Sequence, residues 1–122
     1  MSDCYCDFDE PWKVYSATMR TARKVHVCHE CHARIQPRDR YEHVVGIADS
    51  VETYKTCANC LDLREFVKAH IPCFCWYHDT MVGDAIEAAR HWAHEGPGLL
   101  FGAYRRQIKI KRAAVASRQL CQ

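Results

Sequence analysis

Cys28-His-Glu-Cys31 and Cys57-Ala-Asn-Cys60 are two Cys-x-x-Cys segments separated by residues 32–56. Two cysteines at this spacing can direct both sulfurs to one metal ion, and two such segments supply the four thiolates of a tetrahedral zinc site. Unrelated cysteines and two disulfides are the alternative interpretations. The intervening segment has the length of a β-hairpin. The sequence therefore predicts a zinc site that joins the two ends of a hairpin.

Four further cysteines form two Cys-x-Cys pairs, Cys4 with Cys6 and Cys73 with Cys75, and only Cys121 is left over. The four close pairs are enough for two four-cysteine sites, so we expect two zinc ions per chain. The pairs can fill two sites sequentially, cross-braced as in RING-like domains, or nested. Nested pairing is preferred, because the inner spacing makes a complete finger by itself. His78 is an alternative ligand that could replace one outer thiolate.

The charge of the chain is unevenly distributed, although the net charge is only +2. Every acidic residue lies at or before Glu95, whereas residues 96–122 carry only basic charges. This asymmetry indicates an acidic partner for the tail, either a nucleic acid or an acidic protein surface, unless the basic face is only solvated. The candidate partner-binding residues are Trp12 in the acidic N-terminal loop and the tail residues Arg105, Arg106, Lys109, Lys111 and Arg112.

The chain has no apolar run long enough for a transmembrane helix, and its acidic N-terminus lacks the features of a signal peptide. We therefore expect a cytoplasmic protein without a membrane partner. In a reducing compartment, paired cysteines favour metal binding over disulfides. The sequence favours no particular oligomeric state.

The hydrophobic periodicity indicates strands followed by helices, and together with the cysteine pairs it predicts a small α+β zinc-binding domain. Residues 13–27 alternate only partly and include Arg20, Arg23 and Lys24. The alternation is clearer in a hairpin of residues 41–45 and 51–56, and helical spacing follows in residues 61–70, 81–95 and 99–116. We expect residues 1–78 to hold both zinc sites and residues 79–122 to form a helical hairpin packed on them as one domain.

In two of the predicted helices, the residue spacing places a set of side chains on or near one face. For the first helix the face consists of Leu63, Phe66, Val67 and His70. For the last helix, which is basic, the apolar positions near one face are Leu100, Tyr104, Ile108 and Val115.

The order of a cysteine knuckle, a hairpin and a second knuckle at a helix N-terminus resembles a treble-clef zinc finger over residues 26–70. Cys28, Cys31, Cys57 and Cys60 match the four ligands of that family. The resemblance implies a fold but no single function, because treble clefs serve nucleases, ribosomal proteins, ubiquitin ligases and adaptors.

The whole chain also resembles small zinc-binding accessory proteins of bacteriophages and prophages. The resemblance rests on the Cys-x-Cys start, the finger, Cys73-Phe-Cys-Trp-Tyr-His78 and Pro97-Gly-Leu-Leu-Phe101. It implies an accessory role in the host cytoplasm, such as binding and modulating or inhibiting a host protein, including one of host defence.

Catalytic templates fit the sequence poorly. A zinc deaminase needs His-x-Glu followed by Pro-Cys-x-x-Cys, and Pro72-Cys-Phe-Cys75 is one residue short. A metalloprotease needs His-Glu-x-x-His, but His94-Glu95 runs into glycine and proline. We therefore expect a non-enzymatic module that binds a host protein. Nucleic-acid binding by the basic last helix is the alternative, and a treble-clef nuclease is less favoured.

Overall fold

The computed structural model describes residues 14–47 and 49–119. The predictions for Cys4, Cys6, Trp12 and Cys121 lie outside these residues. Along the chain the elements are β1 (Val14–Thr21), β2 (His26–Val27), β3 (Arg34–Ile35), β4 (Arg40–Ile47), β5 (Val51–Cys57), α1 (Ala58–His70), α2 (Met81–His91), the 3₁₀ turn η1 (Ala93–Glu95) and α3 (Leu99–Gln119).

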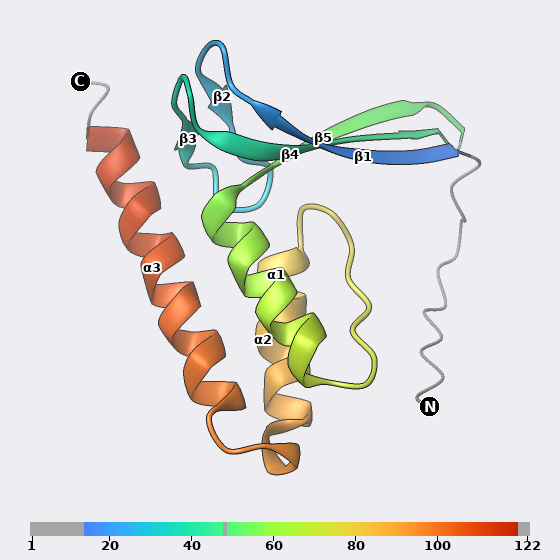
Figure 1. Cartoon of the computed structure of the whole chain (residues 1–122), viewed down its shortest axis with the longest axis vertical. Helices are drawn as coiled ribbons and strands as arrows, with labels where there is room; N and C mark the ends of the chain where they lie inside the picture. Colours follow the sequence, from blue (N-terminus) through green and yellow to red (C-terminus); the bar gives the residue numbers. More distant parts are fainter. Residues whose placement is uncertain (1–13, 48, 120–122) are drawn as a thin grey trace.

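The main sheet is antiparallel, with the strand order β1-β4-β5, and β2 and β3 form a small ribbon beside it. The predicted hairpin is confirmed as β4 and β5, which pair from Tyr41 opposite Cys57 to Ile47 opposite Val51. The partly alternating segment before the first knuckle supplies β1, which pairs along the whole of β4. The three α-helices lie on one side of this sheet, and α3 runs beside α1 (Figure 1).

The helices differ from the predicted ranges mainly at their ends. α1 begins at Ala58, directly after the strand, because Cys57 already takes the N-cap position with extended dihedral angles. α2 stops at His91, and the rest of its predicted range forms the turn η1. α3 continues to Gln119, since no glycine or proline interrupts the chain after Gly102. None of the described helices has the length and apolarity needed to cross a membrane.

The predicted face of α3 is buried only in part: Leu100 and Tyr104 pack against the core, whereas Ile108 and Val115 do not. Ile108 is 47% exposed and Val115 is 51% exposed. Small side chains allow α3 to approach its neighbours closely, and this close packing decides which face is buried. The buried apolar residues of α3 are Leu99, Ala103, Ile110 and Ala114. On α1, the predicted face holds for Leu63 and Val67, whereas His70 is exposed.

One hydrophobic core connects the sheet with all three α-helices. Inside it, both nitrogens of the Arg64 guanidinium terminus donate to the two carboxylate oxygens of Glu42, at 2.9 and 2.6 Å. The guanidinium also lies 5.3 Å from the centroid of the Trp76 ring. Both charged groups are largely buried, so each requires the opposite charge of the other to compensate for lost solvation. The ion pair therefore fixes α1 against β4.

Gly102 marks the closest approach of α3 to α1. A Cβ atom at this position would lie 2.3 Å from the ring of Phe66, whereas a Cβ atom at Gly83 of α2 would meet no atom within 4 Å. Glycine is therefore required for packing at Gly102 but not at Gly83.

We expect Gly102→Ala to lower the free energy of unfolding by about 1–3 kcal/mol, because the methyl group forces the Phe66 ring to shift. Gly83→Ala should raise it by about 0.5–1 kcal/mol, since alanine favours the helix and has space. Denaturant unfolding of the zinc-loaded protein measures both changes. Equal stabilisation by the two substitutions would contradict the close helix approach.

Candidate metal centre

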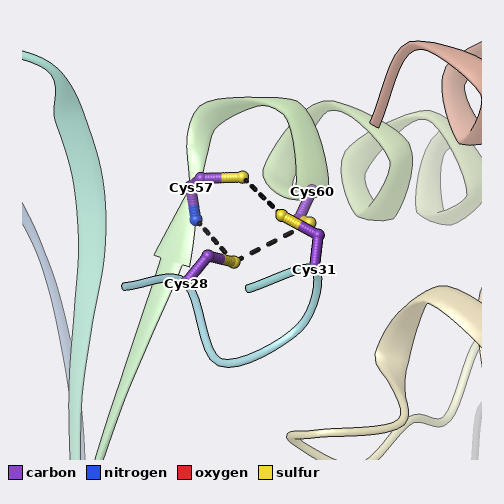
Figure 2. A group of neighbouring side chains, drawn as sticks. All are labelled: Cys28, Cys31, Cys57 and Cys60. Atoms are coloured by element: carbon purple, nitrogen blue, oxygen red, sulfur yellow. Dashed lines mark hydrogen bonds between the residues drawn. The ribbon is translucent and has the colours of Figure 1, made fainter. Parts of the chain in front are cut away.

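Four cysteines from two separate segments meet at the junction of the sheet and α1. Cys28 and Cys31 lie on the loop between β2 and β3, Cys57 ends β5, and Cys60 lies in the first turn of α1 (Figure 2). Their four sulfur atoms all lie within 4.8 Å of one another. The spacing in the sequence therefore predicted this cluster correctly.

The sulfur separations fit a tetrahedral metal ion. The Sγ atoms of Cys28 and Cys60 are 3.9 Å apart, and those of Cys31 and Cys57 are 3.6 Å apart. Zinc at about 2.3 Å from each sulfur of a tetrahedron would separate the sulfurs by about 3.8 Å. Four sulfur ligands are typical of structural zinc sites and fill every position of the tetrahedron. The group could thus hold one metal ion, and its donor set fits zinc.

The surrounding backbone favours negative charge on the sulfurs. The amides of Glu30 and Cys57 donate to Sγ of Cys28 at 3.4 and 3.3 Å. The first turn of α1, which lies within the described residues, has neither an acidic residue nor a side-chain cap, so its positive end faces the cluster. The helix end and the amides therefore take part in stabilising bound thiolates.

Without a cation, the four sulfurs cannot all be ionised. The pKa of Cys28 lies well below its ordinary value, because the thiols of Cys31, Cys57 and Cys60 hydrogen-bond to its sulfur. The pKa values of Cys57 and Cys60 are raised, first by the same interaction with Cys28. The pKa of Cys31 is also lowered: its contact with Cys28 raises it, but its contacts with Cys57 and Cys60 together lower it by more. The protein alone thus favours ionisation of only part of the cluster, and a divalent cation is needed to hold four thiolates. Metal binding should accordingly contribute to folding.

The first knuckle is joined to β5 as well as to β3. Within the knuckle, the amide of Cys28 donates to the carbonyl of Ala33 at 2.9 Å, and His32 adopts the left-handed region with a φ of 61°. Outside it, the amide of His29 donates to the carbonyl of Lys55 at 2.8 Å, and the amide of Lys55 donates to Nδ1 of His29 at 2.9 Å. These bonds fix the first pair of sulfurs relative to the second.

Glu30, between the two cysteines of the first knuckle, connects the metal centre to α2. Its carboxylate accepts hydrogen bonds from the amides of Asp79 at 2.7 Å and Met81 at 3.0 Å, at the start of that helix. Its side chain is 1% exposed. Burial raises the pKa of Glu30, while the two amides act in the opposite direction. No local pattern in the sequence indicates this role of Glu30, because α2 lies far along the chain from the first knuckle.

His78, the predicted alternative ligand, lies among other polar side chains. Its Nδ1 is 4.0 Å from Oε2 of Glu30, and its Nε2 is 3.0 Å from the hydroxyl of Tyr15. Its ring stacks on Tyr54 at a centroid distance of 4.4 Å. Burial is the main cause that lowers the pKa of His78, which favours the neutral ring. These contacts connect the segment before α2 with β1 and β5.

The other predicted residues are the outer cysteine pair and the basic residues of α3. Cys73 and Cys75 are each disulfide-bonded, but not to each other, because their sulfurs are 3.8 Å apart; the predicted partners of this pair lie outside the described residues. On α3, Arg106 turns toward α1, with Nε 3.2 Å from Oδ2 of Asp62 and its guanidinium 3.9 Å from the centroid of Phe66. The tail residues that remain exposed are Arg105, Lys109, Lys111 and Arg112.

Comparison with known proteins adds no relative. No family model matches the chain, and neither the curated proteins nor the solved structures contain a match. The observed order of knuckle, hairpin and helix agrees with the predicted one. Membership of the treble-clef family stays a prediction.

We expect Glu30→Ala to lower the free energy of unfolding by about 1–2 kcal/mol, because two amides at the start of α2 lose their acceptor. Glu87→Ala is the matched control, since Glu87 is an exposed acid of the same helix. It should change stability by less than about 0.5 kcal/mol. Denaturant unfolding at saturating zinc measures both, and equal losses would contradict the connection between the knuckle and α2.

Proposed function

We propose that the protein is a non-enzymatic, zinc-stabilised module that binds another protein through the exposed face of α3. The proposed metal site supports this, because four thiolates leave zinc no open position for water or substrate. The zinc would then act on folding, by holding the sheet, α1 and, through Glu30, α2 in one rigid body.

The observation that carries the proposal is an exposed apolar stripe on α3. Phe101, Ile108 and Val115 are 68%, 47% and 51% exposed and recur every seven residues, which places them on one side of the helix. Arg105 and Arg112 lie between them, and the Arg105 guanidinium is 5.8 Å from the centroid of Phe101. Apolar side chains with basic neighbours fit an amphipathic helix that carries acidic residues.

The charge of α3 argues against pairing between two copies of this chain. The helix has several basic residues and no acidic one. Two such faces brought together would therefore place like charges against each other. The apolar stripe also argues against α3 as a nucleic-acid surface, because phosphate contacts gain nothing from exposed phenylalanine and isoleucine. The resemblance to phage accessory proteins points to a host protein as the partner.

A second zinc ion is part of the same proposal. Cys73 and Cys75 are disulfide-bonded, but not to each other, because their sulfurs are 3.8 Å apart and a disulfide needs about 2.05 Å. In the reduced protein, a separation of 3.8 Å would suit two ligands of one zinc ion in place of the disulfides. Phe74, between them, is buried in the core and would hold the pair in place. Cys4 and Cys6 would complete this site.

We expect two zinc ions per chain by elemental analysis of protein purified under reducing conditions. Cys73→Ser combined with Cys75→Ser should leave one zinc and an intact finger, because the inner cysteines are untouched. Cys28→Ser should instead unfold the finger. One zinc in the wild-type protein, together with a loss of four titratable thiols, would mean that the outer cysteines form disulfides.

The α3 face is tested by comparing two double substitutions. Ile108→Ala with Val115→Ala should weaken capture of the partner from host lysate at least tenfold, since losing buried contacts of this kind costs about 1–2 kcal/mol or more. Val25→Ala with Val51→Ala removes exposed apolar groups of similar size elsewhere and should have no effect. Quantitative mass spectrometry of the captured proteins measures both. Equal losses, or no loss from the α3 pair, would contradict the proposal.

A further inference from the structure

A basic groove lies at the end of β1, and its lining residues include neither a cysteine of the metal site nor a residue of α3. Its volume is about 830 Å³. Most of its lining side chains carry positive charge or can do so. The lining residues are Arg20, Thr21, Ala22, Arg23, Lys24, His26 and Tyr41.

The turn between β3 and β4 brings two more cations to this end of the sheet. The amide of Arg38 donates to the carbonyl of Ala22, and the amide of Ala22 donates to the carbonyl of Asp39, each at 2.8 Å. In the register of β1 and β4, Thr21 lies opposite Arg40. Arg38 and Arg40 are both exposed beside the groove. Pairing of strands distant in sequence therefore gathers basic residues that no single segment contains.

The basic surface continues across the sheet. Thr18, His43 and Lys55 are directly opposite one another on β1, β4 and β5, so their side chains share one face. Arg20 is two residues from Thr18 and lies on the same face. Nζ of Lys55 is 3.0 Å from Nδ1 of His26, which connects this row to the groove. The helices lie against the opposite face of the sheet (Figure 1), which carries Glu42, the partner of Arg64 on α1.

The positive charges of this surface outnumber the carboxylates near them. Within residues 14–47 and 49–119, no ion pair involves the cations of the surface, and the acids of the surrounding segments are engaged elsewhere. Glu42 faces Arg64, Glu30 faces α2, and Asp39 accepts a bond from the amide of Gln36. The six cations are Arg20, Arg23, Lys24, Arg38, Arg40 and Lys55.

The lowered pKa of His43 agrees with positive charge around this surface. Burial is the largest cause that lowers its pKa, and the charges of Arg20 and Lys55 lower it further. A field that repels a proton attracts a phosphate.

We propose that this groove and the adjoining sheet face bind the phosphate backbone of a nucleic acid. Several unpaired cations along an open surface, with threonine hydroxyls beside them, match the contacts that proteins make to phosphates. An acidic protein fits less well, because protein interfaces need apolar anchors, and the apolar and aromatic lining residues Ala22 and Tyr41 are each only 4% exposed. Backbone contacts predict affinity with little preference for base sequence. This proposal is independent of partner binding by α3.

The test is fluorescence anisotropy of the full-length, zinc-loaded protein with a short labelled duplex DNA of mixed sequence. Wild-type affinity should fall steeply between about 50 and 200 mM salt, because bound cations release counterions from the DNA. Arg20→Gln, Arg23→Gln and Lys24→Gln combined should weaken binding and flatten the log–log salt slope by about 2 to 3. All three side chains are exposed, so zinc content and thermal unfolding should stay unchanged.

The matched control removes the same charge from α3, by Arg105→Gln, Lys109→Gln and Arg112→Gln. It should leave the salt slope unchanged. Equal effects of the two triple substitutions, an effect of the α3 substitutions alone, or no wild-type binding at low salt would overturn the proposal. Displacement of the DNA by polyglutamate of equal charge concentration would assign the groove to acidic proteins instead. None of these outcomes affects the capture experiment on α3, so the two proposals fail separately.

Discussion

Mutual repulsion among four clustered thiolates is the constraint on which the rest of the structure depends. The sulfurs of Cys28, Cys31, Cys57 and Cys60 lie within 4.8 Å of one another. Such a cluster is stable as thiolates only around a cation, which would add to the two hydrogen bonds that join His29 of the knuckle to Lys55 of β5. The knuckle has no helix and only the two-residue strands β2 and β3 around it. Metal binding would therefore fix the position of β5 relative to the knuckle, and with it the start of α1.

Two buried carboxylates connect this junction and the sheet to the helices. Glu30 lies inside the knuckle and accepts the amides at the start of α2. Glu42 lies on the central strand and holds Arg64 of α1. Each carboxylate is costly to bury alone and is satisfied by a partner far away in the sequence. These directional interactions specify how the helices lie on the sheet. Apolar packing among many alanines would allow more alternative placements.

Local patterns in the sequence predict the metal cluster, the β4–β5 hairpin and the existence of three helices, because each depends on residues close together in the chain. The remaining features depend on distant pairing. The strand β1 alternates only partly, and its role appears only through its register with β4. The cap by Glu30 joins residues about fifty positions apart. Ile108 and Val115 were predicted near one face of the last helix with Leu100 and Tyr104, and such a periodicity suits either a core or a docking surface. The structure packs Leu100 and Tyr104 against the core and leaves Ile108 and Val115 exposed, with Gly102 in close contact with Phe66 of α1.

The two proposed surfaces differ in the physical chemistry of recognition, which argues for two kinds of partner. The face of α3 has apolar side chains exposed between its cations, so desolvation can supply affinity and the charges can select an acidic partner. The groove at the end of β1 has cations and hydroxyls, and its apolar and aromatic lining side chains, Ala22 and Tyr41, are buried, so its affinity would come from counterion release and vary with salt. A protein that uses both could hold a nucleic acid and a protein at the same time. The rigid body around the metal centre would then set the distance between them.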